Sequence, residues 1–182
     1  MNVTEPIRDN YQIQSMVDYL RARNLRNLIL FLVGIYSGLR IGDELRLRAG
    51  DVRGSHITLR EQKTGKHKRL LIAPQLKREL KPYIENLPDE TYLFPSRQGI
   101  GRPISRKRAY AILKKAARAN GVKHFGCHSM RKTFGHHAYK RTKNVGLLME
   151  LFNHSRPEVT LRYIGHVQDQ FDDTVRGLDF TI

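Results

Sequence analysis

The 182-residue chain is long enough to bury one sizeable hydrophobic core, and no linker-like stretch divides it, so we expect a single domain. Its 33 Lys and Arg residues outnumber its 17 Asp and Glu residues, which gives a formal net charge of +16. This balance favours a polyanionic partner such as nucleic acid, although ribosomal, histone-like and membrane-surface proteins share it.

The first part of the chain predicts two helices and the start of a third. Asp9 or Asn10 is a suitable N-cap for a helix whose apolar residues recur at helical spacing. Between Leu25 and Tyr36 apolar residues surround the next helix, as expected of a segment buried in the core. Gly38 is the usual kind of residue just past a helix end, and a short helix is predicted to begin near Gly42.

A β-hairpin and two further helices are predicted next. Alternating apolar residues, a Thr-Gly turn and a Leu-Leu-Ile run predict two strands between Ser55 and Ala73, joined by a basic turn. Pro74 opens a helix that ends before Pro88, and Ser105 caps another. No acidic residue occurs between Arg102 and Gly121, so the basic face of this last helix favours contact with phosphates.

The sequence favours a cytoplasmic protein. Met1–Pro6 lacks the apolar region of a signal peptide, and the apolar run 28–36 is far shorter than the roughly 20 residues of a membrane span. Cys127 is the only cysteine, so an intrachain disulfide is excluded and a reducing compartment fits best.

A cluster of potential metal ligands occurs in the second half of the chain. These residues are His124, Cys127, His128, His136 and His137. Neither a Cys-x-x-Cys nor a His-Glu-x-x-His spacing is present. We therefore expect no metal and no cofactor, and we expect the two consecutive histidines to lie on a helix surface.

Two short motifs stand out near the C-terminal end. His128 and Arg131 are three positions apart, which makes them neighbours on one face of a helix, and His154 precedes Tyr163 by nine positions. Either motif alone is weak evidence, because a basic protein contains His-x-x-Arg by chance and a tyrosine among apolar residues is usually part of the core. Their order along the chain, after an arginine and a lysine, is the informative feature.

This order, from Arg40 and Lys63 to the His-x-x-Arg, His and Tyr, resembles the catalytic domain of the tyrosine recombinases, the phage integrase family. The resemblance runs from about Tyr11 to Tyr163. It implies an α+β fold: a mostly helical single domain with a small antiparallel sheet. Matched position by position, the family's catalytic residues fall on Arg40, Lys63, His128, Arg131, His154 and Tyr163.

The surrounding residues also match, with one departure. Asp43 lies where the family usually carries an acidic residue, and Asp51-Val52 matches a pair that commonly follows. Asn153 stands where a glycine commonly precedes the second histidine. On the hairpin turn, Lys66 is the alternative to Lys63 as the family's lysine.

The resemblance implies a specific chemistry. Tyr163 attacks a DNA phosphodiester and forms a 3′-phosphotyrosyl bond, which conserves the bond energy for rejoining. The two arginines stabilise charge on the phosphate, and His154 donates a hydrogen bond to it. His128 accepts the tyrosine proton, and Lys63 protonates the leaving 5′ oxygen.

The resemblance also implies partners and a domain organisation. The partners are double-stranded DNA, further protomers assembled on it and possible accessory DNA-binding proteins, so the bound enzyme would be associated with the nucleoid. We expect residues 1–182 to be the catalytic domain, with 164–182 as a C-terminal tail and no preceding core-binding domain. A type IB topoisomerase and a non-catalytic DNA-binding regulator on the same fold remain alternatives, and the target DNA sequence is open.

Overall fold

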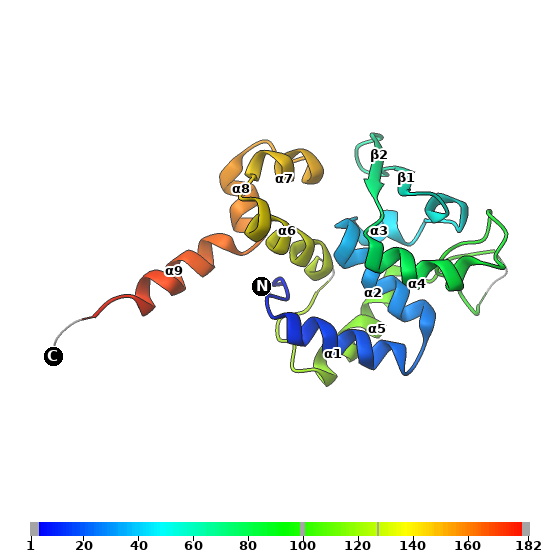
Figure 1. Ribbon diagram of the computed structural model, residues 1–182, viewed down its shortest axis with the longest axis horizontal. Helices are drawn as coiled ribbons and strands as arrows, with labels where there is room; N and C mark the ends of the chain where they lie inside the picture. Colours follow the sequence, from blue (N-terminus) through cyan, green and yellow to red (C-terminus); the bar gives the residue numbers. More distant parts are fainter. Residues whose placement is uncertain (1–3, 99–100, 127, 180–182) are drawn as a thin grey trace.

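Figure 1 shows the computed structural model, which describes residues 4–98, 101–126 and 128–179. The helices and strands follow one another in this order: α1 (Asn10–Arg21), α2 (Leu25–Ser37), α3 (Ile41–Glu44), a 3-10 turn (Gly50–Val52), β1 (His56–Arg60), β2 (His67–Leu71), α4 (Pro74–Ile84), α5 (Arg106–Ala119), α6 (Ser129–Thr142), α7 (Val145–Phe152), α8 (Pro157–Tyr163) and α9 (His166–Arg176).

Helix α2 is the centre of the main hydrophobic core. It packs against α1, α4 and α6, and its residues from Leu28 to Gly34 are all buried. The Asn24 side chain accepts a hydrogen bond from a backbone N–H of the first turn, and Gly38 ends the helix with φ 62°. A left-handed residue suits glycine, and it turns the chain directly into α3. Arg40, the last of the three residues between these two helices, is therefore held on a rigid, buried support.

The two strands form the antiparallel hairpin that the sequence predicts. Their register pairs His56 with Leu71 at one end and Arg60 with His67 at the other. Asp43 in α3 accepts a hydrogen bond of 2.8 Å from the backbone N–H of Gln62, just past β1. Because this aspartate is buried, the bond fixes the start of the turn against the helix that follows Gly38.

A second, smaller hydrophobic cluster joins α6, α7 and α8. Its buried residues are Leu148, Phe152 and Ile164. Gly135 of α6 allows the close approach, because a Cβ at this position would lie 2.6 Å from Ile164 and 2.8 Å from Phe152. This cluster lies beside the main core, and Figure 1 shows α7 and α8 on one side of the molecule and the hairpin on the other.

Helix α9 projects away from the remainder of the chain (Figure 1) and contains no buried residue over its described length. Phe171 and Val175 are exposed on it. Ile164, two residues before α9, is fully buried in the cluster of α6, α7 and α8.

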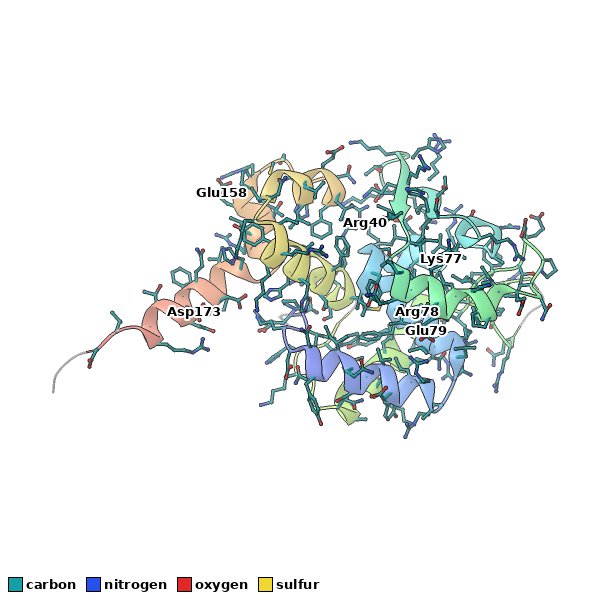
Figure 2. All side chains as sticks on the ribbon, viewed as in Figure 1. Arg40, Lys77, Arg78, Glu79, Glu158 and Asp173 are labelled. Atoms are coloured by element: carbon teal, nitrogen blue, oxygen red, sulfur yellow. The ribbon has the colours of Figure 1, made fainter. Side chains whose placement is uncertain are left out.

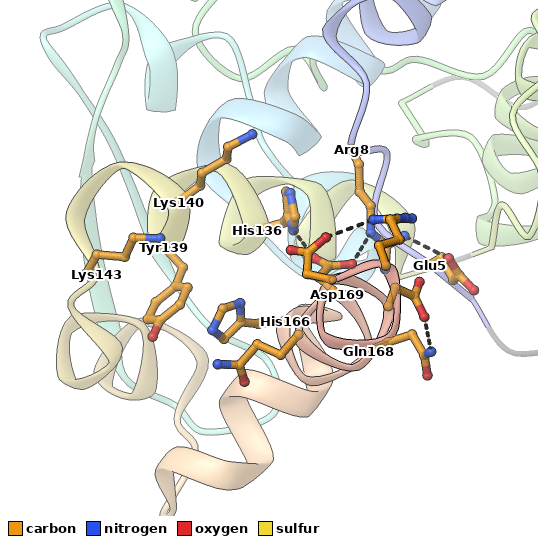
Figure 3. Close-up of a pocket in the computed structure, with 13 residues that line it drawn as sticks. Glu5, Arg8, His136, Tyr139, Lys140, Lys143, His166, Gln168 and Asp169 are labelled. Atoms are coloured by element: carbon orange, nitrogen blue, oxygen red, sulfur yellow. Dashed lines mark hydrogen bonds and ion pairs between the residues drawn. The ribbon is translucent and has the colours of Figure 1, made fainter. Parts of the chain in front are cut away.

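The base of α9 is attached to the N-terminal segment and to α6. Asp169 pairs with Arg8 at 2.7 Å and with His136 at 3.5 Å, as drawn in Figure 3. His136 and His137 are therefore partly buried and not surface residues of α6, contrary to expectation. His137 Nε2 contacts the backbone carbonyl oxygen of Ile7 at 3.0 Å.

The expected fold class is confirmed: the structure is mostly helical with one two-stranded antiparallel sheet. Across residues 4–98, 101–126 and 128–179, no helix is long and apolar enough to cross a membrane. In the same residues no three His, Cys, Asp or Glu side chains gather as a metal site needs, and Cys127 lies outside them.

Candidate active site

Arg40 occupies the junction between α2 and α3, where it is the residue before the first turn of α3. Its Nη1 donates to Glu61 Oε1 at 2.8 Å, and its Nη2 lies 3.5 Å from the carbonyl oxygen of Phe152. The side chain therefore lies between the hairpin and α7 (Figure 2). It is held at one edge, and the remaining donors of its guanidinium are available to an anion.

Arg131 comes from the first turn of α6 and is almost fully buried, with 4% of its surface exposed. It donates to the carbonyl of Gly38 and, at 3.3 Å, to the carbonyl of Phe152. Its guanidinium carbon lies 4.4 Å from the centre of the Phe152 ring. Arg40 contacts the same carbonyl, so the two predicted arginines converge on the C-terminal end of α7.

Tyr163, the last residue of α8, faces both predicted histidines. Its hydroxyl lies 3.4 Å from His128 Nδ1, and its ring centre lies 5.2 Å from that of His154. His128 is the N-cap of α6, so it precedes the helix that carries Arg131 instead of lying within it. His154 Nδ1 contacts the hydroxyl of Thr160 at 3.0 Å, which fixes the direction of the ring.

The charges around the phenol set its protonation state and that of the histidines. Burial raises the pKa of Tyr163, and the positive charges of Arg131 and Arg40 oppose this increase without cancelling it. Removal from water, followed by the same two arginines, lowers the pKa of His154. The pKa of His128 is lowered in the same way, with Lys132 as an additional cause. At neutral pH the site therefore holds a protonated phenol next to a neutral imidazole that is free to accept a proton.

The two hairpin lysines Lys63 and Lys68 occupy different environments. Lys63 is exposed in the turn, and none of the described residues forms a hydrogen bond or ion pair with its ammonium. Lys68 in β2 instead pairs with Glu61 at 3.0 Å and donates to the carbonyl of Leu151. Burial lowers the pKa of Lys68; the hydrogen bond and charge of Glu61 oppose this decrease without cancelling it, and the charges of Arg131 and Arg40 add to it. The structure thus places Lys68, and not Lys63, next to the arginines.

Four further residues belong to this site and were not predicted from the sequence: Lys68, Glu61, Asn153 and Phe152. Lys68 and Glu61 lie in a basic hairpin, where charged side chains are normally solvated. The departure at Asn153 was the one available signal: its backbone is left-handed, with φ 55°, and its side chain donates to Glu61 Oε2 at 3.0 Å.

The arrangement suits the transfer of a phosphoryl group. Two guanidiniums stabilise the negative charge that builds on a phosphate, a neutral imidazole accepts a proton, and a phenol is the nucleophile. The Phe152 ring, which lies against Arg131, also packs against Tyr163, so every predicted catalytic residue except Lys63 belongs to one connected set of contacts.

Comparisons with known proteins agree with this geometry. The family model described as "Phage integrase family" matches residues 8–170. The chain belongs to the phage integrase family. It is 43% identical over 170 residues to the Bacillus subtilis (strain 168) protein named as a probable integrase/recombinase, YoeC, and the match covers 93% of each chain.

Solved structures of phage integrase relatives share the fold. The site-specific recombinase XerH has a TM-score of 0.74 at 16% identity, over 97% of this chain and 53% of its own. The catalytic domain of bacteriophage HP1 integrase has a TM-score of 0.63 at 17% identity, over 96% and 95% of the two chains. Other recombinase relatives are matched over 45% to 55% of their own length, so this chain spans about half of them.

Proposed function

We propose that this protein is a site-specific DNA recombinase that cleaves and rejoins strands through a covalent 3′-phosphotyrosyl intermediate. The observation that carries the proposal is the placement of the Tyr163 hydroxyl 3.4 Å from His128 Nδ1, beside an almost fully buried Arg131. In this proposal residues 1–182 are the catalytic domain, of which residues 164–182 form a C-terminal tail.

Each predicted residue has a role in the proposed reaction. The phenol of Tyr163 attacks phosphorus, its proton passes to His128, and the bond from phosphorus to the 5′ oxygen breaks. Arg40 and Arg131 donate to the nonbridging oxygens, on which negative charge increases in the transition state. His154 adds a further donor through the ring nitrogen that does not face Thr160.

Lys63 is proposed as the general acid that protonates the leaving 5′ oxygen. Its exposed position in a turn leaves the side chain free to move toward bound DNA. The backbone of the turn is held by the bond from Gln62 to Asp43 and by a bond from the Gly65 N–H to the Glu61 carbonyl, so the Lys63 side chain is the part that moves. Rejoining is the reverse reaction, in which a 5′ hydroxyl attacks the phosphotyrosine.

We propose double-stranded DNA and further copies of this chain as partners. Among the structural relatives, XerH was solved on its difH substrate and lambda integrase as a dimer on a core site. In this chain Arg106, the first residue of α5, contacts Gln62 Oε1 at 3.4 Å. The basic face of α5 is therefore continuous with the hairpin turn, which gives a phosphate backbone one charged path to the active site.

A covalent adduct is the experiment that tests the proposal. The protein is incubated with nicked duplex DNA of a cognate site and analysed by denaturing electrophoresis. A protein–DNA band that resists denaturation is expected, and a purely regulatory DNA-binding protein will not produce it. Exchange of strands between two labelled sites, without relaxation of unrelated supercoiled DNA, separates a recombinase from a type IB topoisomerase.

A further inference from the structure

Glu61 is a carboxylate whose side chain has no exposed surface. Its Oε1 accepts from Arg40 Nη1 at 2.8 Å and from Lys68 Nζ at 3.0 Å. Its Oε2 accepts from the Thr64 hydroxyl at 2.7 Å and from Asn153 Nδ2 at 3.0 Å. Four donors, two of them on charged groups, surround both oxygens, which is the arrangement that makes a buried carboxylate tolerable.

The contacts of Glu61 keep it ionised. Burial on its own raises the pKa of this carboxyl, but the hydrogen bonds from Thr64 and Lys68 and the charges of Lys68 and Arg40 outweigh burial, and the pKa lies below its ordinary value. Glu61 is thus a negative charge inside a group of three cations, Arg40, Lys68 and Arg131. It reduces the repulsion among them and so allows them to be buried close together.

The same carboxylate joins three segments that are distant in sequence. It lies just past β1, two positions before Lys63 in the turn. Its partner Arg40 is 21 residues away at the junction of α2 and α3, and its partner Asn153 is 92 residues away at the end of α7. Each of the three segments contains a predicted catalytic residue, because His154 directly follows Asn153.

Several bonds fix the end of α7. Among those described here, the bond that Asn153 donates to Glu61 is the one whose partner is a negative group. Lys68 donates to the carbonyl of Leu151, and both arginines contact the carbonyl of Phe152. Asn153 then turns the chain with its left-handed backbone. Glycine adopts this conformation without strain, so the asparagine is not needed for the turn itself. What asparagine adds is an amide that donates to Glu61.

We propose that Glu61 is a positioning residue of the active site, which orients Arg40 toward the scissile phosphate and, through Asn153, fixes the distance from Arg40 to His154. The proposal rests on the proposed strand-cleavage function and deepens it. Glu61 itself does not contact the reacting atoms.

Two single variants and their combination test the proposal. Glu61→Gln keeps the size of the side chain but turns an amide toward the amide of Asn153. Asn153→Asp sets a second carboxylate about 3 Å from Glu61, at the position of the present hydrogen bond. The double variant restores one donor and one acceptor. We expect each single variant to slow adduct formation at saturating DNA by at least about 10-fold, and the double variant to recover to within about 3-fold of the wild type.

A third variant changes the contact with little strain. Asn153→Gly keeps the left-handed turn and removes only the side-chain bond to Glu61. We expect it to slow adduct formation by about 3-fold to 10-fold while the Kd for duplex DNA stays within about 2-fold, because the basic surface is unchanged. Leu80→Ala, in the core of α4, is the control for a general loss of stability.

The outcomes separate this inference from the proposed function. If wild-type protein forms no adduct, the proposed function fails. If the wild type forms it and the three single variants and the double variant all react at the wild-type rate, the positioning role alone is wrong. The role is also wrong if the double variant is no faster than the slower single variant, or if Leu80→Ala, melting at a similarly lowered temperature, slows adduct formation equally.

Discussion

The three lysines of the hairpin are predicted to respond differently to replacement by alanine. Lys63 and Lys66 are exposed in the turn, so each substitution should change the free energy of unfolding by no more than about 0.5 kcal/mol. Lys68 is 11% exposed and pairs with a fully buried Glu61. Its loss leaves the carboxylate with one cationic partner, which should destabilise the fold by about 3 kcal/mol and lower Tm by roughly 6 to 12 °C.

The three substitutions should rank differently by their effect on the cleavage rate than by their effect on the free energy of unfolding. Lys63→Ala should slow cleavage of ordinary DNA by ~10²-fold, the size expected from the loss of a general acid. A substrate whose leaving 5′ oxygen is replaced by sulfur needs no proton, so it should restore most of the rate to this variant. Lys66→Ala is the matched control, since it removes the same charge from the same turn, and it should cleave both substrates at nearly the wild-type rate.

Lys68→Ala should also cleave slowly, but the sulfur substrate should not rescue it, because this variant displaces Arg40 and not the acid. Single-turnover adduct formation on the two substrates, with urea unfolding of each variant, measures all of these effects. Rescue of Lys68→Ala by sulfur, together with normal cleavage by Lys63→Ala, would refute the assignment and make Lys68 the acid.

Two further predictions concern pH and salt. Folding lowers the pKa values of His128 and His154. Once the pH falls below about 6.5, the ordinary histidine pKa, the unfolded chain therefore binds more protons than the folded chain. The free energy of unfolding should therefore be level near pH 8 and decrease as the pH falls through about 6.5. The cleavage rate should fall to half its value only below about pH 6.5. A midpoint above about 6.5 in the rate profile would contradict a neutral imidazole in the folded protein. Binding of duplex DNA should weaken by ~10³-fold or more between 50 and 200 mM salt if roughly six phosphates are contacted, and a titration that changes by less than 10-fold would rule out a mainly electrostatic interface.

Much of the fold could be predicted from local signals. Asp9, Asn24 and Ser105 cap helices through side-chain bonds to nearby backbone N–H groups, and Gly38 ends α2. Such signals depend on a few neighbouring residues, so they can be read without knowing the fold. The hairpin was predictable for the same reason, from alternation on either side of a short turn.

Helices α7 and α8 were not predicted. They contain eight and seven residues, which is too short for a periodic pattern to be distinctive. Asn144 and Pro157 mark where they begin, but the division between them depends on the left-handed backbone of Asn153. That conformation is fixed by contacts that come from distant segments.

The candidate site was predictable as a set of residues but not as a network. Resemblance to a family provided the residues around Tyr163, and the structure brings all of them together except Lys63. Glu61 and Lys68 were missed because a charged residue in a hairpin is expected to be solvated. Their burial depends on partners that lie 92 and 83 residues away, and no local pattern indicates such pairs.

The most direct test of the account is the identity of the residue that becomes attached to DNA. Protein trapped on a nicked cognate substrate is digested, and the peptide that carries the nucleotide is sequenced by mass spectrometry. We predict that the modification lies on Tyr163, that Tyr163→Phe forms no adduct, and that this variant still binds the same DNA with unchanged Kd. An adduct on any other residue, or one that persists in Tyr163→Phe, would contradict the account.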